Sequence, residues 1–211
     1  MSVRKKAPED LTAKKALALE VIRRLKAEYP DAGCTLDYDH AWQLLVSVRL
    51  AAQCTDARVN IVVEELFAKY PSVAALAAAE PEDIEAIVKP CGLGHSKARD
   101  ISACMRMLRD KYDCKVPTTF EELLALPGVG RKSANLIMGD VFGKPAIVTD
   151  THCIRLCNKI GLVDGIKEPQ KVEMALWKIV PPEEGSDLCH RFVMHGRAVC
   201  NARKPECEKC C

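Results

Sequence analysis

The stretch from Leu126 to Asn135, which reads LPGVGRKSAN, constrains the fold more than any other part of the chain. Pro127 ends a helix that residues 120–125 can form, and glycines at 128 and 130 permit backbone angles that other residues resist. A polar start, RKS, then gives way to an apolar helical pattern. The stretch therefore predicts a hairpin between two helices.

Such a hairpin offers a site for an anion. The amides of Gly128, Val129 and Gly130 are expected to point outward, and the positive end of the next helix dipole lies at the same place. Lys132 falls in the first turn of that helix. The alternative is ordinary Pro/Gly punctuation followed by a solvated lysine. The local pattern favours a phosphate-binding hairpin.

The rest of the chain predicts an all-α protein. Of its 211 residues, 48% are hydrophobic, which is enough for a core, but only 5% are aromatic, which disfavours a sheet. The single strand candidate, residues 146–148, is too short to build one. Besides the hairpin unit at 118–142, apolar periodicity and capping residues predict helices at 12–28, 41–53, 56–70, 73–78, 81–88, 96–111, 153–160, 169–180 and 187–199.

The ends of the chain bear on location. Residues 1–10 are polar and no apolar run follows them, so we expect neither a secretion signal nor a membrane anchor. The protein is expected to be intracellular, and cytoplasmic if bacterial. Its twelve cysteines are then thiols or metal ligands sooner than disulfides. A net charge of +2 means that any nucleic-acid surface must be local.

Three cysteines near the end of the chain form a second chemical signal. Cys200, Cys207 and Cys210 have the spacing C-x6-C-x2-C, which indicates a soft metal or an iron–sulfur cluster. A zinc site and a group of incidental thiols are the alternatives. Both kinds of metal site need a fourth ligand, for which Cys211 and Cys189 are the nearest thiols.

Two further residues have predicted places. Leu93 lies between two glycines, so we expect it at an exposed loop tip. Asp150 precedes a helical pattern and predicts an N-cap.

Several short motifs of the sequence resemble those of one family. LPGVGRKSAN is followed by VTDTHCIR and by HGRAVC with the C-x6-C-x2-C spacing, and AAQCTD and GLGHSKA precede it in the same order. From about Lys14 onward, the chain resembles the endonuclease III family of DNA glycosylase/AP lyases, a branch of the helix-hairpin-helix superfamily.

The resemblance implies a fold and an activity. The expected fold is all-α, with a six-helix barrel at 34–144 that contains the hairpin, and a second helical domain built from 1–33 and 145–211 that carries a 4Fe-4S cluster. The expected enzyme is a monomer whose double-stranded DNA substrate, containing oxidised pyrimidines or abasic sites, lies across the groove between the domains. It would remove the base through a lysine Schiff base and cut the strand by β-elimination.

The resemblance also assigns roles to residues. Lys132 matches the nucleophile and Asp150 the catalytic aspartate, while Gln53 matches the residue that fills the hole in the duplex and Leu93 the wedge in the base stack. The other implied DNA contacts are His95, Gly128, Val129, Gly130 and Arg131.

The cluster ligands implied by the family include Cys200, Cys207 and Cys210. The fourth cysteine is expected five residues after Cys210, so we expect the protein to continue past Cys211.

Two other functions compete with this interpretation. An adenine-mismatch glycosylase would share the hairpin, the aspartate and the cluster, but that branch generally lacks a lysine at the position of Lys132. A non-catalytic helix-hairpin-helix module would use the hairpin only to bind DNA. The presence of both Lys132 and Asp150 argues against each.

Overall fold

The computed structural model describes residues 11–211, and these fold into helices joined by turns, with no strand in that range. The prediction of an all-α fold is confirmed. The strand candidate at 146–148 is an extended connector with buried side chains, and the Val148 N–H donates to the Cys189 sulfur instead of to a partner strand. No helix in residues 11–211 has the length and apolar character needed to cross a membrane. The polar segment at 1–10 lies outside the described residues.

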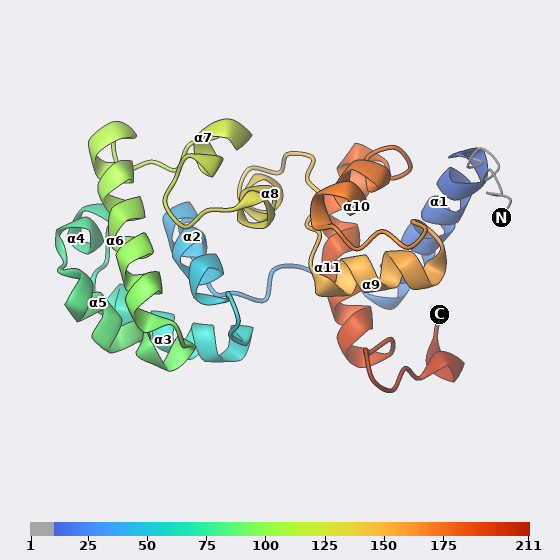
Figure 1. Ribbon diagram of the computed structural model, residues 1–211, viewed down its shortest axis with the longest axis horizontal. Helices are drawn as coiled ribbons and strands as arrows, with labels where there is room; N and C mark the ends of the chain where they lie inside the picture. Colours follow the sequence, from blue (N-terminus) through green and yellow to red (C-terminus); the bar gives the residue numbers. More distant parts are fainter. Residues whose placement is uncertain (1–10) are drawn as a thin grey trace, which may run out of the picture. The chain divides into compact units, whose positions relative to one another are not determined.

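The chain divides into two compact units. The first combines the N-terminal residues up to Gly33 with Pro145–Cys211, and the second is the continuous segment Cys34–Lys144. In the first unit, α1 (Leu11–Glu28) lies with α9 (Thr151–Ile160), α10 (Pro169–Leu176) and α11 (Gly185–Ala198), although most of the chain separates α1 from them in sequence (Figure 1).

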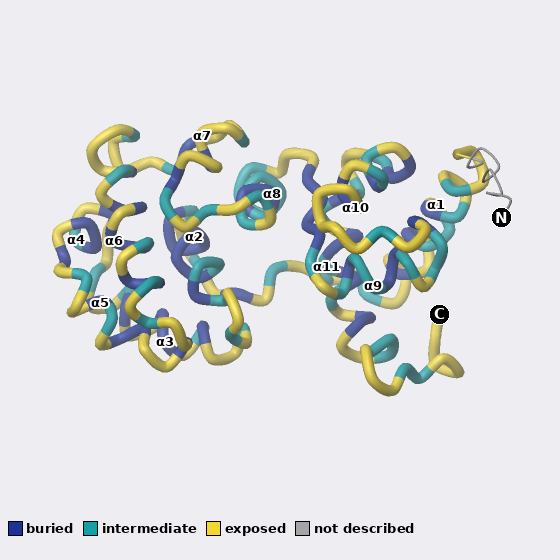
Figure 2. Tube along the Cα trace, in the orientation of Figure 1, coloured by how far each residue is buried: buried dark blue, intermediate teal, exposed yellow. Residues whose placement is uncertain are grey.

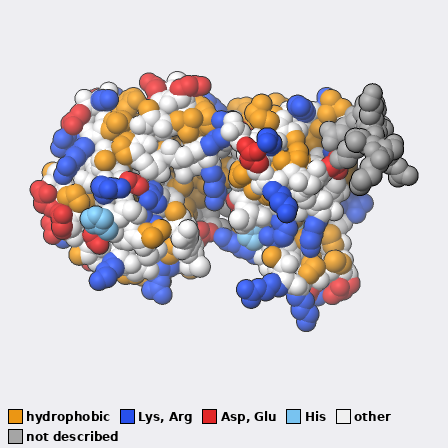
Figure 3. Space-filling view, viewed as in Figure 1, with side chains coloured by type: hydrophobic (Ala, Val, Ile, Leu, Met, Phe, Trp, Pro, Cys, Tyr) orange, Lys and Arg blue, Asp and Glu red, His pale blue; other side chains and the backbone are white. Residues whose placement is uncertain are grey.

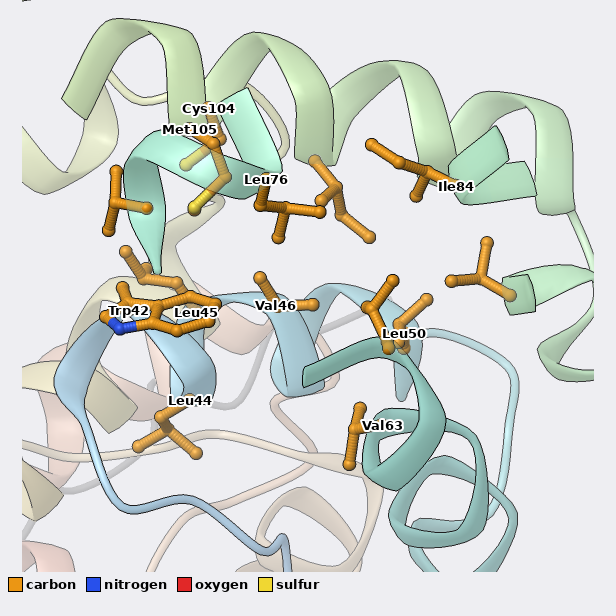
Figure 4. Close-up of a cluster of buried hydrophobic side chains, with 14 of the residues drawn as sticks. Trp42, Leu44, Leu45, Val46, Leu50, Val63, Leu76, Ile84, Cys104 and Met105 are labelled. Atoms are coloured by element: carbon orange, nitrogen blue, oxygen red, sulfur yellow. The ribbon is translucent and has the colours of Figure 1, made fainter. Parts of the chain in front are cut away.

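The second unit is arranged around helix α2, which is buried on most of its sides (Figure 2). On one side of α2, Trp42, Leu45 and Val46 approach the helices that carry Leu76 and Met105 (Figure 4). Burying each such side chain contributes about 1.5–3 kcal/mol. The elements of this unit are α2 (Ala41–Leu50), α3 (Asp56–Lys69), α4 (Val73–Ala78), α5 (Pro81–Val88), the 3-10 turn η1 (Lys89–Cys91), α6 (Gly94–Lys111), α7 (Phe120–Leu124) and α8 (Arg131–Asp140).

Local capping chemistry sets the helix starts that the sequence predicted well. The Thr55 hydroxyl accepts from the Arg58 N–H at the start of α3, and Pro81 occupies the first turn of α5. The predicted helix at 41–53 is too long, because α2 ends at Leu50 and Gln53 has a left-handed backbone with φ 58°.

The first unit joins the two ends of the chain. The Tyr29 hydroxyl lies 3.1 Å from Nδ1 of His195, and Arg191 donates to the Tyr29 carbonyl, so the end of α1 is tied to α11. This unit contains α1 (Leu11–Glu28), α9 (Thr151–Ile160), α10 (Pro169–Leu176), η2 (Pro182–Glu184), α11 (Gly185–Ala198) and η3 (Cys207–Lys209).

Candidate functional site

The hairpin between α7 and α8 is a tightly packed turn. The Val129 N–H donates to the Leu126 carbonyl at 3.1 Å, and the Leu126 side chain is buried. Gly128 has φ 74°, and a Cβ there would lie 2.9 Å from the Cβ of Asp100. An ion pair between Arg49 and Asp100, 2.8 Å from Nη2 to Oδ2, forms the surface against which this glycine packs. Only glycine satisfies both the backbone angle and the space.

Gly130 has a different role from the one the sequence predicted. Its φ of −98° and ψ of 177° are ordinary extended values, so its backbone does not require glycine. A Cβ at Gly130 would meet nothing within 4 Å. Gly130 is the N-cap of α8 and has no side chain to accept from the first-turn amides. Its effect is to leave that helix N-terminus open.

The prediction that three hairpin amides point outward is wrong for Val129, whose N–H is used inside the turn. The physical reason is that the turn closes on itself between Leu126 and Val129. Within residues 11–211, the amides of Gly128 and Gly130 have no protein acceptor. The open donors of the hairpin are therefore the two glycine amides.

Two basic residues begin α8. Lys132 is exposed in the first turn, so its amine lies at the surface near the open N-terminus. The guanidinium of Arg131 lies over the ring of Phe120, 5.0 Å from its centroid, which ties α8 back to α7.

Gln53 and Leu93 lie on two exposed loops of the second unit. The predicted loop-tip position of Leu93 is confirmed, since the side chain is 57% exposed. Both residues have left-handed backbones, with φ 58° at Gln53 and 52° at Leu93. Each such residue carries about 1–3 kcal/mol of strain, which the surrounding structure must offset. His95, near Leu93, is exposed and its Nδ1 lies 3.0 Å from Glu85.

Sequence reasoning missed Lys97, which is completely buried. Its Nζ donates to the carbonyls of Leu50 at 2.8 Å and Cys91 at 2.9 Å. Burial lowers the pKa of Lys97. One sequence signal could have revealed it, because Lys97 falls on the apolar face of α6 in register with Ile101 and Met105.

Asp150 belongs to the first unit and caps α9, as the sequence predicted. Its Oδ1 accepts from the Cys153 N–H at 2.7 Å, and the residue is half-buried. The backbone bond from Asp150 N–H to the Val148 carbonyl, 3.1 Å, further restricts it. The carboxylate is thus held by its own helix.

The motifs DTH and HGR contact each other in the first unit. A Cβ at Gly196 would overlap Nδ1 of His152, so α9 and α11 approach this closely only because residue 196 is glycine. Arg155 extends the contact by donating to the carbonyls of Gly196 and Cys200. The start of the cysteine segment is therefore anchored on α9.

The cysteine segment, residues 200–211, is mostly exposed. Cys207 and Cys210 are exposed, and the Cys210 sulfur lies 3.6 Å from Nε2 of the buried His195. Cys189 is buried on α11, where it accepts from Val148. In the described part of the chain, no three His, Cys, Asp or Glu side chains converge as a metal site. The donors are thus of the right kind for an iron–sulfur cluster but are not gathered around a common point.

Charges of both signs lie on the face of the molecule drawn in Figure 3. On the face in Figure 3, Lys and Arg side chains are interspersed with Asp and Glu, in keeping with a net charge of +2. Any preference for an anion must then come from local features such as the α8 N-terminus.

Comparison with known proteins gives one consistent result. Residues 46–182 match the family model described as HhH-GPD superfamily base excision DNA repair protein. The chain is 42% identical over 201 residues to endonuclease III of Synechocystis sp., covering 95% of this chain and 91% of that protein. It is 38% identical to endonuclease III of Escherichia coli, covering 93% and 92%.

The structural comparison agrees. A trapped covalent intermediate of endonuclease III with DNA is similar with a TM-score of 0.88 at 40% identity, covering 93% of this chain and 92% of that one. A non-covalent endonuclease III–DNA complex has the same values. A thermostable thymine-DNA glycosylase, at 23% identity and a TM-score of 0.81, shares the fold.

Proposed function

Because the chain belongs to the endonuclease III family of the HhH-GPD superfamily, and is thus a base excision repair DNA glycosylase/AP lyase, we propose that it removes oxidised pyrimidines with Lys132 as nucleophile. Asp150 assists the departure of the base. The substrate is double-stranded DNA that contains an oxidised pyrimidine or an abasic site, and the enzyme acts as a monomer.

One observation carries the assignment of Lys132. It is an exposed amine in the first turn of α8, immediately after a hairpin whose glycine amides have no acceptor in the described chain. Donors in this arrangement suit a DNA phosphate. A phosphate bound there would place the sugar of a flipped nucleotide within reach of the lysine.

The chemistry follows from the properties of a primary amine. Attack of neutral Lys132 on C1′ forms a C–N bond while the C1′–N bond to the base breaks and the base leaves with its electron pair. Opening of the sugar ring gives a Schiff base. Loss of a proton from C2′ then expels the 3′ phosphate, so the strand is cut by β-elimination.

Asp150 contributes a fixed negative charge. As the base departs, positive charge develops on the sugar, and a preorganised carboxylate stabilises it without reorganising at that moment. The cap bond from the Cys153 N–H to Oδ1 supplies this preorganisation, because it limits where the carboxylate can point.

Gln53 and Leu93 serve the extraction of the damaged base. A base cannot be attacked inside the stack, so the nucleotide is turned out, at the expense of lost stacking and pairing. An exposed leucine can enter the stack as a wedge, and a glutamine can bond to the base that is left unpaired. His95, Arg131 and the hairpin glycines contact the DNA backbone near the flipped nucleotide.

The test is reductive trapping on DNA with an abasic site. With borohydride, the wild-type protein forms a covalent adduct, and Lys132→Ala loses it. Lys132→Arg is the matched control, because it keeps the positive charge for DNA binding but forms no stable adduct. An adduct that persists undiminished in both variants would remove Lys132 from the mechanism.

The two rival functions give different results in the same assay. An adenine-mismatch glycosylase would excise adenine from a mispair and leave oxidised pyrimidines in place. A binding module would retain DNA affinity but cut neither substrate. Excision of an oxidised pyrimidine with strand cleavage, lost together in Lys132→Ala, distinguishes the proposed enzyme from both.

The family generally carries a 4Fe-4S cluster, and we propose that Cys200, Cys207 and Cys210 hold one here. Thiolates are the donors that such clusters take, and a cluster would draw the exposed segment together. No step of the reaction passes through it. Iron and sulfide analysis of the purified protein tests the proposal, with about four irons per chain expected. Zinc, or no metal, in protein that still excises bases would reject the cluster while leaving Lys132 in place.

A further inference from the structure

The completely buried lysine of the second unit has no role in the chemistry above. Lys97 is 0% exposed, and its ammonium donates to two backbone carbonyls, those of Leu50 and Cys91. A buried charge without a carboxylate partner is costly, because hydration is lost and two neutral dipoles replace it only in part. Burial raises the pKa of the neighbouring Cys91 thiol to about 11, so that thiol supplies no counter-charge at neutral pH. Such a residue requires an explanation other than simple packing.

The positions of the two carbonyls suggest the explanation. Leu50 is the last residue of α2 and Cys91 the last residue of η1. Carbonyls in a final helical turn receive no N–H donor from within the helix, so they need an outside donor. Lys97 serves both ends with one nitrogen, and thereby fixes the distance between the segments that follow them.

Those segments carry the two residues that extract the base. Gln53 comes three residues after Leu50, and Leu93 two residues after Cys91. Both have left-handed backbones, with φ 58° at Gln53 and 52° at Leu93, a conformation that residues with side chains resist. Strained residues persist only where the surrounding structure holds them. The Lys97 ammonium bonds to both segments, two or three residues before each strained residue.

We propose that Lys97 is a positioning residue that joins the Gln53 turn to the Leu93 loop. Gln53, which fills the hole in the duplex, and Leu93, the wedge, then enter the DNA as one rigid element. The inference rests on the proposed roles of Gln53 and Leu93. It adds that their spacing is set before DNA binds, by a side chain that touches no nucleotide.

The first test is Lys97→Met, which nearly keeps the length and apolar stem of the side chain and removes both hydrogen bonds. A misplacement of about 1 Å can slow an enzyme about 100-fold, so single-turnover excision of an oxidised pyrimidine should fall about 10- to 100-fold. Affinity for undamaged duplex should stay within about twofold, because the hairpin phosphate contacts are untouched. Fluorescence of 2-aminopurine opposite the lesion, which reports unstacking, should fall with the excision rate.

The matched control is Met105→Ala. Met105 is also fully buried on α6, two turns further along, and touches neither loop carbonyl. If Met105→Ala, at an equal loss of melting temperature, reduces excision and 2-aminopurine fluorescence as much as Lys97→Met does, the effect of Lys97 is general destabilisation and the proposal fails.

The second test is a double-mutant cycle with Leu93→Gly. If Lys97 acts by holding the wedge, Leu93→Gly should slow excision much less in the Lys97→Met background than in the wild type. Fully additive losses would overturn the proposal. Should Lys97→Met fail to fold, the same cycle is run with Lys97→Gln, which retains an N–H donor.

Failure of the underlying function is distinguishable. If Leu93→Gly alone leaves excision unchanged, the wedge assignment is wrong. If Leu93→Gly slows excision and Lys97→Met does not, the wedge stands and the inference about Lys97 is wrong.

Discussion

The helices that carry the two proposed catalytic residues begin in opposite ways. At α8 the N-cap is Gly130, which offers no acceptor, and the lysine follows in the first turn. At α9 the N-cap is Asp150, whose carboxylate accepts from the Cys153 N–H. Every helix N-terminus presents unpaired amides and a partial positive charge. The first helix leaves this positive end to an anion from outside, while the second fills it with its own.

The difference shows how one backbone feature serves two needs. An open N-terminus binds a phosphate, which brings a sugar towards Lys132. A capped N-terminus fixes a carboxylate, which Asp150 needs if it is to act as a preorganised charge. The choice depends on a single residue in each case.

The largest effect should come from removing the charge at the capped helix. Asp150→Asn keeps an N-cap acceptor, so the fold should survive, but it loses the negative charge, and base excision should slow about 10²-fold. Single-turnover excision and a thermal melt measure the two roles separately. An unchanged rate would mean that Asp150 is only an N-cap, and the capped start of α9 would then have a structural role alone.

The next effect concerns the packing that holds the open helix in place. Gly128→Ala forces a Cβ against Asp100 and a left-handed backbone on alanine, so unfolding free energy should fall by about 1–3 kcal/mol. Gly130→Ala, whose Cβ meets open space, should cost less, about 0.5–1 kcal/mol, because alanine is a poorer N-cap than glycine. Equal melting temperatures for the two variants would contradict the different roles given to the two glycines.

A direct exchange of the two helix starts gives a third prediction. Gly130→Asp places at α8 the cap that α9 already has, so the helix should gain a few tenths of a kcal/mol while its carboxylate repels a phosphate. Affinity for abasic-site DNA should fall about tenfold, as expected for a disfavoured charge contact of about 1.4 kcal/mol. Gly130→Asn caps without charge and is the control. If both weaken binding equally, bulk rather than charge is responsible.

The smallest effect is on salt dependence. Affinity for DNA should fall steeply with salt, with a log–log slope of about −0.9 for each phosphate neutralised. Lys132→Ala should make the slope shallower by about one contact. Titration from low to moderate salt measures it, and a slope that does not change would place Lys132 away from the phosphate backbone.

Local signals predicted most of the fold. Thr55, Pro81 and Asp150 act within a few residues of themselves, and so the helices they start were found from the sequence alone. The predicted end of α2 was wrong because Gln53 is a good helix former, whereas α2 ends at Leu50, whose carbonyl accepts from Lys97, 47 positions along the chain. Propensity cannot detect a contact of that kind.

The site was predictable to a similar limit. The hairpin and the N-cap are short continuous motifs, which the sequence shows directly. The ion pair between Arg49 and Asp100, and the lack of space for a Cβ at Gly128, depend on how α2, α6 and the hairpin pack. In sequence, a buried lysine differs from a solvated one only in its position, and Lys97 lies on the apolar face of α6. The sequence could not separate the roles of Gly128 and Gly130 either. A glycine is equally suited to a positive φ, to a close contact with a neighbour, and to an N-cap without a side chain.

The pairing of α1 with α11 has a consequence for synthesis of the protein. Tyr29 and Arg191, which join these helices, lie 162 positions apart, and a ribosome adding about 5–20 residues per second needs roughly 10–30 s between them. The second unit, a continuous segment, is synthesised within that interval, but the apolar stripe of α1, formed by Ala18, Ile22 and Leu25, must wait for α11. The nascent chain thus carries an exposed amphipathic helix at its leading end until translation is almost finished, and any chaperone demand of this protein should concentrate on that helix.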